Sequence, residues 1–185
     1  MRQDGITLFD LMIALAISAL LFSAAIPTLN PMIEKYSSES VSQQIYHAYH
    51  LGRQYSINHH QNVTICGSNS GTQCEREWSK YILVFVDADN DQEISTGDTQ
   101  ILTSSVDAER GSITTRVALS KPHTIVTPRG DAKFAGSMIY CPASNDASFA
   151  QRVTWNPVGR PYLGRDVDGD GIIEYTDGHP IRCPQ

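Results

Sequence analysis

The feature that most constrains this chain is an apolar run close to its N-terminus. From Ile6 to Ile26 the sequence reads ITLFDLMIALAISALLFSAAI and carries one charged residue, Asp10. A helix rises about 1.5 Å per residue, so a run of this length spans the hydrocarbon core of a bilayer. Only Arg2 precedes the run as a positive charge and no small-residue cleavage pattern follows it, which argues against an ordinary secretory signal peptide. We therefore predict one membrane-spanning helix.

Asp10 is the residue of this run that requires a physical explanation. An ionisable side chain inside a membrane segment is costly unless it has a partner or a function. The terminal ammonium group of another copy would be a suitable partner, because opposite charges attract strongly where the dielectric constant is low. Asp10 therefore favours assembly into a larger structure. The alternative is a lone polar residue at the rim of a simple membrane anchor.

A helical pattern continues beyond the apolar run. Apolar residues recur mostly at spacings of three, four and seven with polar residues between them, as in an amphipathic helix: Ile33, Val41, Ile45, Ala48 and Tyr55. This pattern predicts one long helix from about residue 6 to about residue 58. Pro27 and Pro31 interrupt its hydrogen-bond ladder, so we expect a kink or local unwinding between its two halves.

The pattern changes after this helix to short β-branched or aromatic runs separated by Gly, Pro, Asn and Asp. The expected strands are Val63–Cys66, Tyr81–Val86, Gln100–Thr103, Ser112–Val117, His123–Thr127, Met138–Cys141, Arg152–Trp155 and Ile172–Tyr175. A helix followed by a block of antiparallel strands is an α+β arrangement, in which the amphipathic face of the helix covers the inner face of the sheet.

Four cysteines indicate two disulfides in an oxidising compartment. Cys66 and Cys74 flank GSNSGTQ, a turn-rich stretch that can bring its ends together, which leaves Cys141 and Cys183 for each other. Four cysteines allow three connectivities, and free thiols are the other alternative.

An acidic pattern near the C-terminus is the sharpest chemical signal. Carboxylates occupy positions 1, 3, 5, 9 and 12 of a twelve-residue loop, with a glycine at position 6 and the Ile172 carbonyl at position 7: Asp166, Asp168, Asp170, Glu174 and Asp177. The spacing is close to that of an EF-hand calcium loop, although position 12 is Asp rather than Glu and no helical pattern flanks the loop. A calcium site and a solvated acidic turn therefore stay open as interpretations.

A second acidic run repeats this spacing less completely. It contains Asp87, Asp89, Asp91 and Asp98, but Gln92 stands where the glycine of the tight turn belongs. The missing glycine weakens the calcium interpretation here, and a hairpin turn rich in Asp and Asn that needs no metal is the alternative. No cofactor is required by either loop, and calcium is the single candidate.

Catalytic motifs and a broad basic character are both missing from the sequence. The histidines His47, His50, His59 and His60 have no acid or cysteine at metal-site spacing, and no nucleophile elbow, phosphate loop or dinucleotide fingerprint is present. We therefore expect no enzyme. The formal net charge of −6 also opposes sequence-independent attraction to nucleic acid or anionic lipid.

The N-terminal segment resembles the class III leader and first helix of type IV prepilins and type II secretion pseudopilins. The resemblance is carried by Gly5, the following ITLFDLM, the apolar helix and Pro27. It implies cleavage by a prepilin peptidase after Gly5, methylation of the new N-terminus at Ile6, and a contact between Asp10 and the N-terminus of a neighbouring subunit. The chain departs from the family pattern at Ile6, where Phe is usual, and at Asp10, where Glu is usual.

Later phrases resemble the GspH/FimT family of minor pilins and pseudopilins: FVDADND followed by DTQIL, PRGDAKFAGSMIYCP, and VTWNPVGRPYL. The resemblance implies the pilin fold, with a leader over residues 1–5, a membrane half of the helix over 6–29 and a periplasmic head over 30–185. Before assembly the chain would be a single-pass inner-membrane protein, and after assembly it would lie in the pilus at the cell surface. Its implied partners are other major and minor pilins, the inner-membrane assembly platform and the peptidase.

Three roles in such a filament are consistent with the sequence. The first is a FimU-like minor pilin that lies at or near the pilus tip and supports the initiation of assembly. Another is a minor pseudopilin of type II secretion. The remaining alternative is a DNA-binding pilin for natural transformation, with cations and a stacking ring at Arg152, Arg160, Tyr162, Arg165 and Arg182. Gly159-Arg160-Pro161-Tyr162 matches only the first half of the family's GRxR stretch, and the acidic loop beside it would repel phosphates unless calcium neutralised it.

Overall fold

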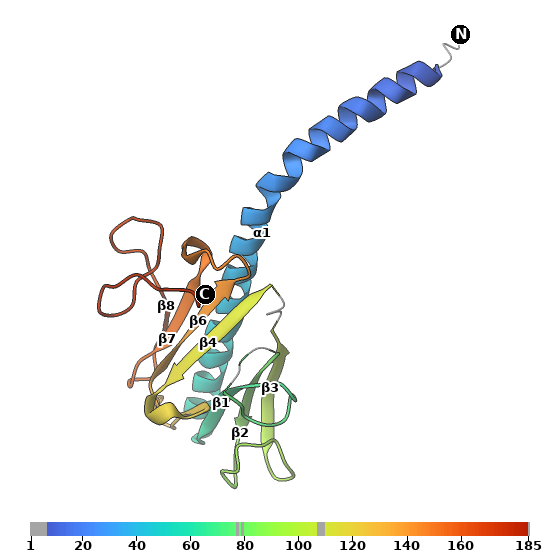
Figure 1. Ribbon diagram of the computed structural model, residues 1–185. Helices are drawn as coiled ribbons and strands as arrows, with labels where there is room; N and C mark the ends of the chain where they lie inside the picture. Colours follow the sequence, from blue (N-terminus) through green and yellow to red (C-terminus); the bar gives the residue numbers. More distant parts are fainter. Residues whose placement is uncertain (1–6, 77, 79, 107–109, 185) are drawn as a thin grey trace. The chain divides into compact units, whose positions relative to one another are not determined.

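The computed structural model describes residues 7–76, 78, 80–106 and 110–184, and for residues 24–28 it describes the backbone alone. The chain divides into two compact units, Met1–Ile33 and Glu34–Gln185. Helix α1 (Leu8–His59) begins in the first unit and continues into the second (Figure 1). Its bounds agree with the predicted long helix. The helix is continuous through Pro27 and Pro31, so the local unwinding that we expected there is absent, because each proline removes one donor and the ladder continues on either side.

The strands of the second unit form two antiparallel sheets rather than one (Figure 1). One sheet has the order β3-β2-β1-β5 and the other the order β4-β6-β7-β8. The strands are β1 (Val63–Ser68), β2 (Tyr81–Val86), β3 (Thr99–Ser105), β4 (Gly111–Val117), β5 (His123–Val126), β6 (Gly136–Pro142), β7 (Gln151–Trp155) and β8 (Pro161–Leu163). The α+β class predicted from the sequence is confirmed.

The last predicted strand is wrong, and another strand takes its place. Ile172–Tyr175 forms no strand, only an isolated bridge between Glu174 and Pro180. Its isoleucines are partly buried and pack against the small cluster that contains Ile139 and Ile181. Strand β8 was not expected, since it is three residues long and begins with a proline. A proline is tolerated there because the first residue of an edge strand needs no ladder donor.

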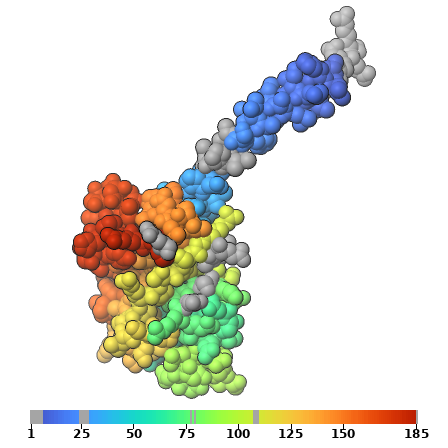
Figure 2. Space-filling model, in the orientation of Figure 1, coloured from blue at the N-terminus to red at the C-terminus, as the bar shows by residue number. Residues whose placement is uncertain are grey.

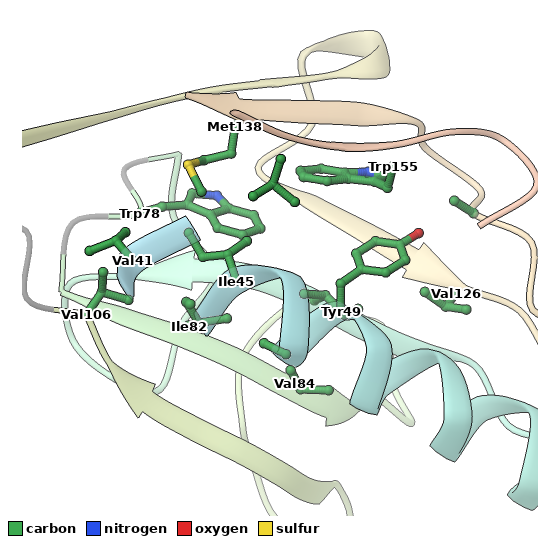
Figure 3. Packing of buried hydrophobic residues seen from close by; sticks show 14 of the residues in the cluster. Val41, Ile45, Tyr49, Trp78, Ile82, Val84, Val106, Val126, Met138 and Trp155 are labelled. Carbon is green, nitrogen blue, oxygen red and sulfur yellow. The ribbon is translucent and has the colours of Figure 1, made fainter. Parts of the chain in front are cut away.

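The main core lies between α1 and the inner faces of both sheets (Figure 3). Val41, Ile45 and Tyr49 recur at a spacing of four, which places them on one side of the helix. Ile82 of β2 packs in this core, as does Met138 of β6. One set of helical residues therefore holds the two sheets together.

Aromatic rings connect this core across its elements. Trp155 of β7 stacks on Tyr49 of α1 with ring centroids 5.6 Å apart, and on Trp78 with centroids 5.9 Å apart. All three side chains are almost fully buried. Such pairs add to the stabilisation that comes from the buried area itself.

Strand β2 is buried on both faces. Alternate side chains of a strand point to opposite faces, so Ile82 and Val84 enter the main core while Leu83 and Phe85 form a separate cluster with Cys66. The loop that contains Cys74 covers this second face of β2. It is held there because Cys66 is joined to Cys74 and the Cys74 amide donates to the Gln92 carbonyl at 2.9 Å.

The second disulfide joins Cys141 of β6 to Cys183 near the C-terminus. Both disulfides have the pairing predicted from the sequence. The Cys141–Cys183 bond holds the C-terminal tail against a smaller cluster that contains Ile139 and Ile181. The segment after β8 is thereby held at the second sheet, where it forms part of the surface coloured red in Figure 2.

Candidate functional site

The start of α1 is organised around Asp10. The cleavage and methylation predicted at Gly5 and Ile6 lie outside the described residues. Thr7 precedes the helix and Asp10 lies in its first turn. The Asp10 carboxylate accepts hydrogen bonds from the Thr7 amide at 3.1 Å and the Thr7 hydroxyl at 2.8 Å, while the Thr7 Oγ1 accepts from the Asp10 amide at 3.3 Å.

This reciprocal arrangement is a capping box with Asp in the position usually held by Glu. Sequence reasoning missed it, although the signal was present as T-x-x-D before an apolar run. Asp10 therefore has a local role in starting the helix, beside any role toward another subunit.

The apolar side chains that the structure describes in the first unit, over residues 8–23 and 29–33, are exposed. Large apolar residues with more than half of their surface exposed include Leu8, Phe9, Leu15, Leu20 and Phe22. Among the residues that the structure describes, no helix satisfies the combined length and hydropathy criteria of a membrane span.

The C-terminal acidic loop gathers four of its predicted oxygen ligands. Asp166, Asp168, Asp170 and Glu174 each place one carboxylate oxygen so that all four atoms lie within 4.8 Å of one another. Asp177 is not part of this group, because its Oδ1 accepts from the His179 amide in a separate turn. Position 12 of the predicted loop therefore lies outside the group of four, and its role as a ligand stays a prediction.

Local hydrogen bonds hold the loop in its turn. Asp166 accepts from the Gly169 amide at 2.6 Å and from the Gly171 amide at 2.8 Å. Asp168 and Asp170 accept from amides two residues further along. Gly171 has φ +88°, in the left-handed region that glycine tolerates, as position 6 of a calcium loop requires.

The second acidic loop brings three of its four carboxylates together. Oxygens of Asp87, Asp89 and Asp91 lie within 4.8 Å of one another, whereas Asp98 is used as a cap for the amides of Ala88 and Ser95. These two N–H groups lower the pKa of Asp98. Desolvation raises the pKa of Asp87, and the negative charges of Asp91 and Asp98 raise it further against the lowering effect of two backbone amides.

The predicted DNA-contacting residues are divided by burial. Arg152 is 4% exposed, donates from Nη1 to the Glu174 carbonyl at 2.7 Å and lies 5.7 Å from the Tyr175 ring centroid. It is a structural arginine and unavailable to a phosphate, so its assignment to DNA contact is wrong. The remaining members of the set are exposed: Arg160, Tyr162, Arg165 and Arg182.

The histidines of α1 make local ring contacts. His50 Nε2 lies 3.1 Å from the Tyr46 hydroxyl, and His59 stacks on Tyr55 with centroids 4.0 Å apart. Burial lowers the pKa of His50, and the positive charge of Arg53 lowers it further. In the described part of the chain, neither group of residues able to hold a metal includes a histidine.

His123 is the histidine most enclosed by the head. It is 4% exposed in β5 and contacts Phe134 edge to face. Burial lowers its pKa, and the nearby positive charges of Lys121 and Lys133 lower it further.

A long helix whose second half packs against two antiparallel sheets, while its first half exposes apolar residues, defines a subunit of the pilin class. The sequence profile of the family described as type II transport protein GspH matches residues 41–159, more than half of the chain. The chain therefore belongs to the GspH family, whose members are minor pilins and pseudopilins.

Solved structures share this fold. The type IV minor pilin FimU of Pseudomonas aeruginosa is 12% identical in one crystal form, with a TM-score of 0.57 over 83% of this chain and 100% of that one. In a second crystal form it is 11% identical, with a TM-score of 0.53 over 69% and 92%. The minor pseudopilin EpsH from the type 2 secretion system of Vibrio cholerae is 14% identical, with a TM-score of 0.51 over 69% and 95%. No curated protein sequence matches the chain significantly.

Proposed function

We propose that this chain is a minor pilin of a type IV pilus or a related filament, placed at or near the tip, where it supports the initiation of assembly. Residues 6–29 would anchor it in the inner membrane, with the head of residues 30–185 in the periplasm, until the assembly platform inserts it among other pilins. The observation that carries this proposal is the exposed apolar surface of the first unit. The match to the GspH family supports it.

An apolar helix of this kind needs a covering. Phe9, Leu20 and Phe22 are each more than two-thirds exposed, and each would be stabilised by roughly 1.5–3 kcal/mol on complete burial. Lipid supplies that environment before assembly, and the first helices of neighbouring subunits supply it afterwards. Asp10 lies in the first turn of this helix. There its carboxylate can also face the terminal ammonium group of an adjacent subunit.

The test separates the two roles of Asp10. In the native host, Asp10→Asn removes the negative charge, and Thr7→Val is the matched control because it removes the Thr7 hydroxyl bonds and leaves the carboxylate. We expect Asp10→Asn to abolish incorporation into purified filaments and reduce pilus number, with Thr7→Val close to wild type. Equal incorporation of Asp10→Asn and wild type would contradict the assembly role, and equal loss in both variants would reduce Asp10 to a helix cap.

Processing supplies an independent measurement. Mass spectrometry of the protein from cells with the peptidase should find a chain shortened by residues 1–5 and carrying a methyl group on Ile6. An uncut chain that retains Met1 would contradict the proposal.

Deletion distinguishes this role from the two alternatives. Loss of a minor pilin reduces pilus number, loss of a type II pseudopilin blocks protein secretion, and loss of a DNA receptor reduces transformation while pili remain. DNA binding ranks second, since Arg160 and Arg165 are exposed. The burial of Arg152 and the acidic cluster that follows Arg165 weaken it. A gel shift of the full-length protein at stepped salt, with Arg160→Ala and Arg165→Ala as variants, tests it directly.

A further inference from the structure

We propose that the loop 166–174 is a calcium site in which Glu174 is the central ligand, together with Asp166, Asp168 and Asp170. The site lies beyond residues 41–159, the part of the chain that matches the GspH family. It is independent of the filament role proposed above.

The first observation is the convergence of charge. Four carboxylate oxygens lie within 4.8 Å of one another, and they come from residues spaced as the ligands of a calcium loop. Like charges this close repel one another. Within the described part of the chain, none of these four carboxylates has an ion pair with a lysine, arginine or histidine. Repulsion of this kind is relieved by a bound cation.

The second observation is independent of the cluster and concerns burial. Glu174 is 6% exposed, whereas the three aspartates are exposed. Its Oε2 accepts from the Val167 amide at 2.9 Å, and Val167 lies between two of the cluster aspartates, so the carboxylate faces the loop. Its Oε1 is buried and has no hydrogen-bond partner among the described residues. Buried carboxylate oxygens almost always have a donor or a metal, so this atom is the strongest sign of a missing ligand.

Arg152 does not supply the missing positive charge. Its Nη1 donates to the Glu174 backbone carbonyl rather than to the carboxylate, and its Nε is itself buried without a partner among the residues described. The guanidinium therefore fixes the backbone of Glu174. It leaves the Glu174 Oε1 without a hydrogen-bond partner among the described residues.

The chemistry of the ligands selects calcium. All of them are carboxylate oxygens, three from exposed aspartates and one from the buried Glu174. Calcium accepts six to eight oxygens in irregular geometry, whereas magnesium demands a near-ideal octahedron. Glu174 would take over the bidentate role usually held at position 12, because Asp177 lies outside the group of four carboxylates and its Oδ1 accepts from the His179 amide. The Ile172 carbonyl and waters would complete the shell. An affinity of roughly 10⁻⁴ to 10⁻³ M, as in extracellular modules, fits so open a loop.

Calcium there would stabilise the C-terminal part of the head. Glu174 is bridged to Pro180, and the Ile181 amide donates to the Ile173 carbonyl at 2.9 Å, so the loop and the tail form one small unit closed by Cys183. A cation that holds Glu174 to the aspartates therefore connects the segment after β8 to the tail.

The experiment is isothermal titration of the full-length protein in detergent with calcium chloride, and separately with magnesium chloride, after treatment with chelator. We expect one calcium per chain, weaker binding of magnesium, and a rise in melting temperature of about 4 °C at calcium ten times above the dissociation constant. No calcium heat and no shift up to about 10 mM would overturn the proposal, as would an equal response to magnesium.

Variants test the ligands and guard against misfolding. Glu174→Gln keeps an acceptor for the Val167 amide and places an amide donor toward the aspartates, so in chelator it should melt at or above wild type while its calcium affinity falls at least about tenfold. Asp168→Asn should weaken calcium binding similarly with an unchanged far-ultraviolet circular dichroism spectrum. Asp177→Asn is the matched control and should bind as wild type. Unchanged calcium affinity in Glu174→Gln, or loss of binding in Asp177→Asn alone, would refute the ligand set.

Discussion

The two disulfides should stabilise the fold unequally, because they close loops of different length. Cys141 and Cys183 are separated by 42 positions in the sequence, and Cys66 and Cys74 by 8. In the chain-entropy description, a cross-link stabilises by removing freedom from the unfolded chain, and the effect grows with the logarithm of the loop length. By this description, the Cys141–Cys183 bond contributes about 4 kcal/mol to the free energy of unfolding and the Cys66–Cys74 bond about 2.5 kcal/mol.

The comparison uses two double variants, Cys141→Ala with Cys183→Ala and Cys66→Ala with Cys74→Ala. Cys66 and Cys141 are both buried, so the loss of packing is similar in the two variants and largely cancels in the difference. We expect the Cys141–Cys183 variant to lose about 1.5 kcal/mol more of the free energy of unfolding than the Cys66–Cys74 variant.

Urea unfolding of the full-length protein in detergent, with chelator present throughout, measures this difference. Intrinsic fluorescence is a suitable probe, because Trp78 and Trp155 are each 1% exposed and lie in the core that all elements share. An equal or greater loss on removal of Cys66–Cys74 would refute the loop-length reasoning. It would mean that loss of the cover over the second face of β2 costs more free energy than the difference in unfolded-chain entropy between the two loops.

Two further perturbations test the packing and the electrostatics of the head. Gly159 has φ +72°, and an added Cβ would overlap the Gly130 carbonyl oxygen, whereas Gly178 has φ +83° with open space around it. In urea unfolding, Gly159→Ala should therefore lower the free energy of unfolding by about 3 kcal/mol or more and Gly178→Ala by about 1 kcal/mol. Similar losses in the two variants would contradict the clash. His123 has its pKa lowered below the ordinary 6.5 in the folded state, so the folded chain binds fewer protons and its stability is complete above about pH 6.5 and falls as the pH drops through the folded pKa. His123→Gln should therefore flatten the dependence of the urea midpoint between about pH 7 and pH 5, and an unchanged slope would exclude His123 as its source.

Local patterns in the sequence were sufficient for the long helix and most strands. The spacing of Val41 and Ile45 predicts a helix face, and that face lies in the core. Seven of the eight predicted strands coincide with strands β1 to β7, because alternation and turn residues act over a few positions. The exception, Ile172–Tyr175, shows that β-branched residues can pack against an apolar cluster without pairing in a sheet.

The candidate sites divide in the same way. Spacing alone identified the acidic residues that cluster, since Asp166, Asp168 and Asp170 are close along the chain. Spacing also included Asp177, which lies outside the group of four. It assigned Arg152 to the surface, although that side chain is 4% exposed. Whether a charged side chain is exposed depends on residues far away in sequence, such as Glu174, whose backbone carbonyl accepts from Arg152.

The sequence by itself determined the features that depend on neighbouring residues: the apolar half of α1, most strand positions, the short Cys66–Cys74 loop and the acidic loop. The tertiary structure alone decided how β2 is buried on both faces, that the strands divide into two sheets, and that the Glu174 carboxylate is enclosed with one oxygen lacking a partner. The physical reason is that periodicity and turn chemistry are properties of short segments, whereas burial is a property of the packed chain, set by contacts between residues that the sequence keeps far apart.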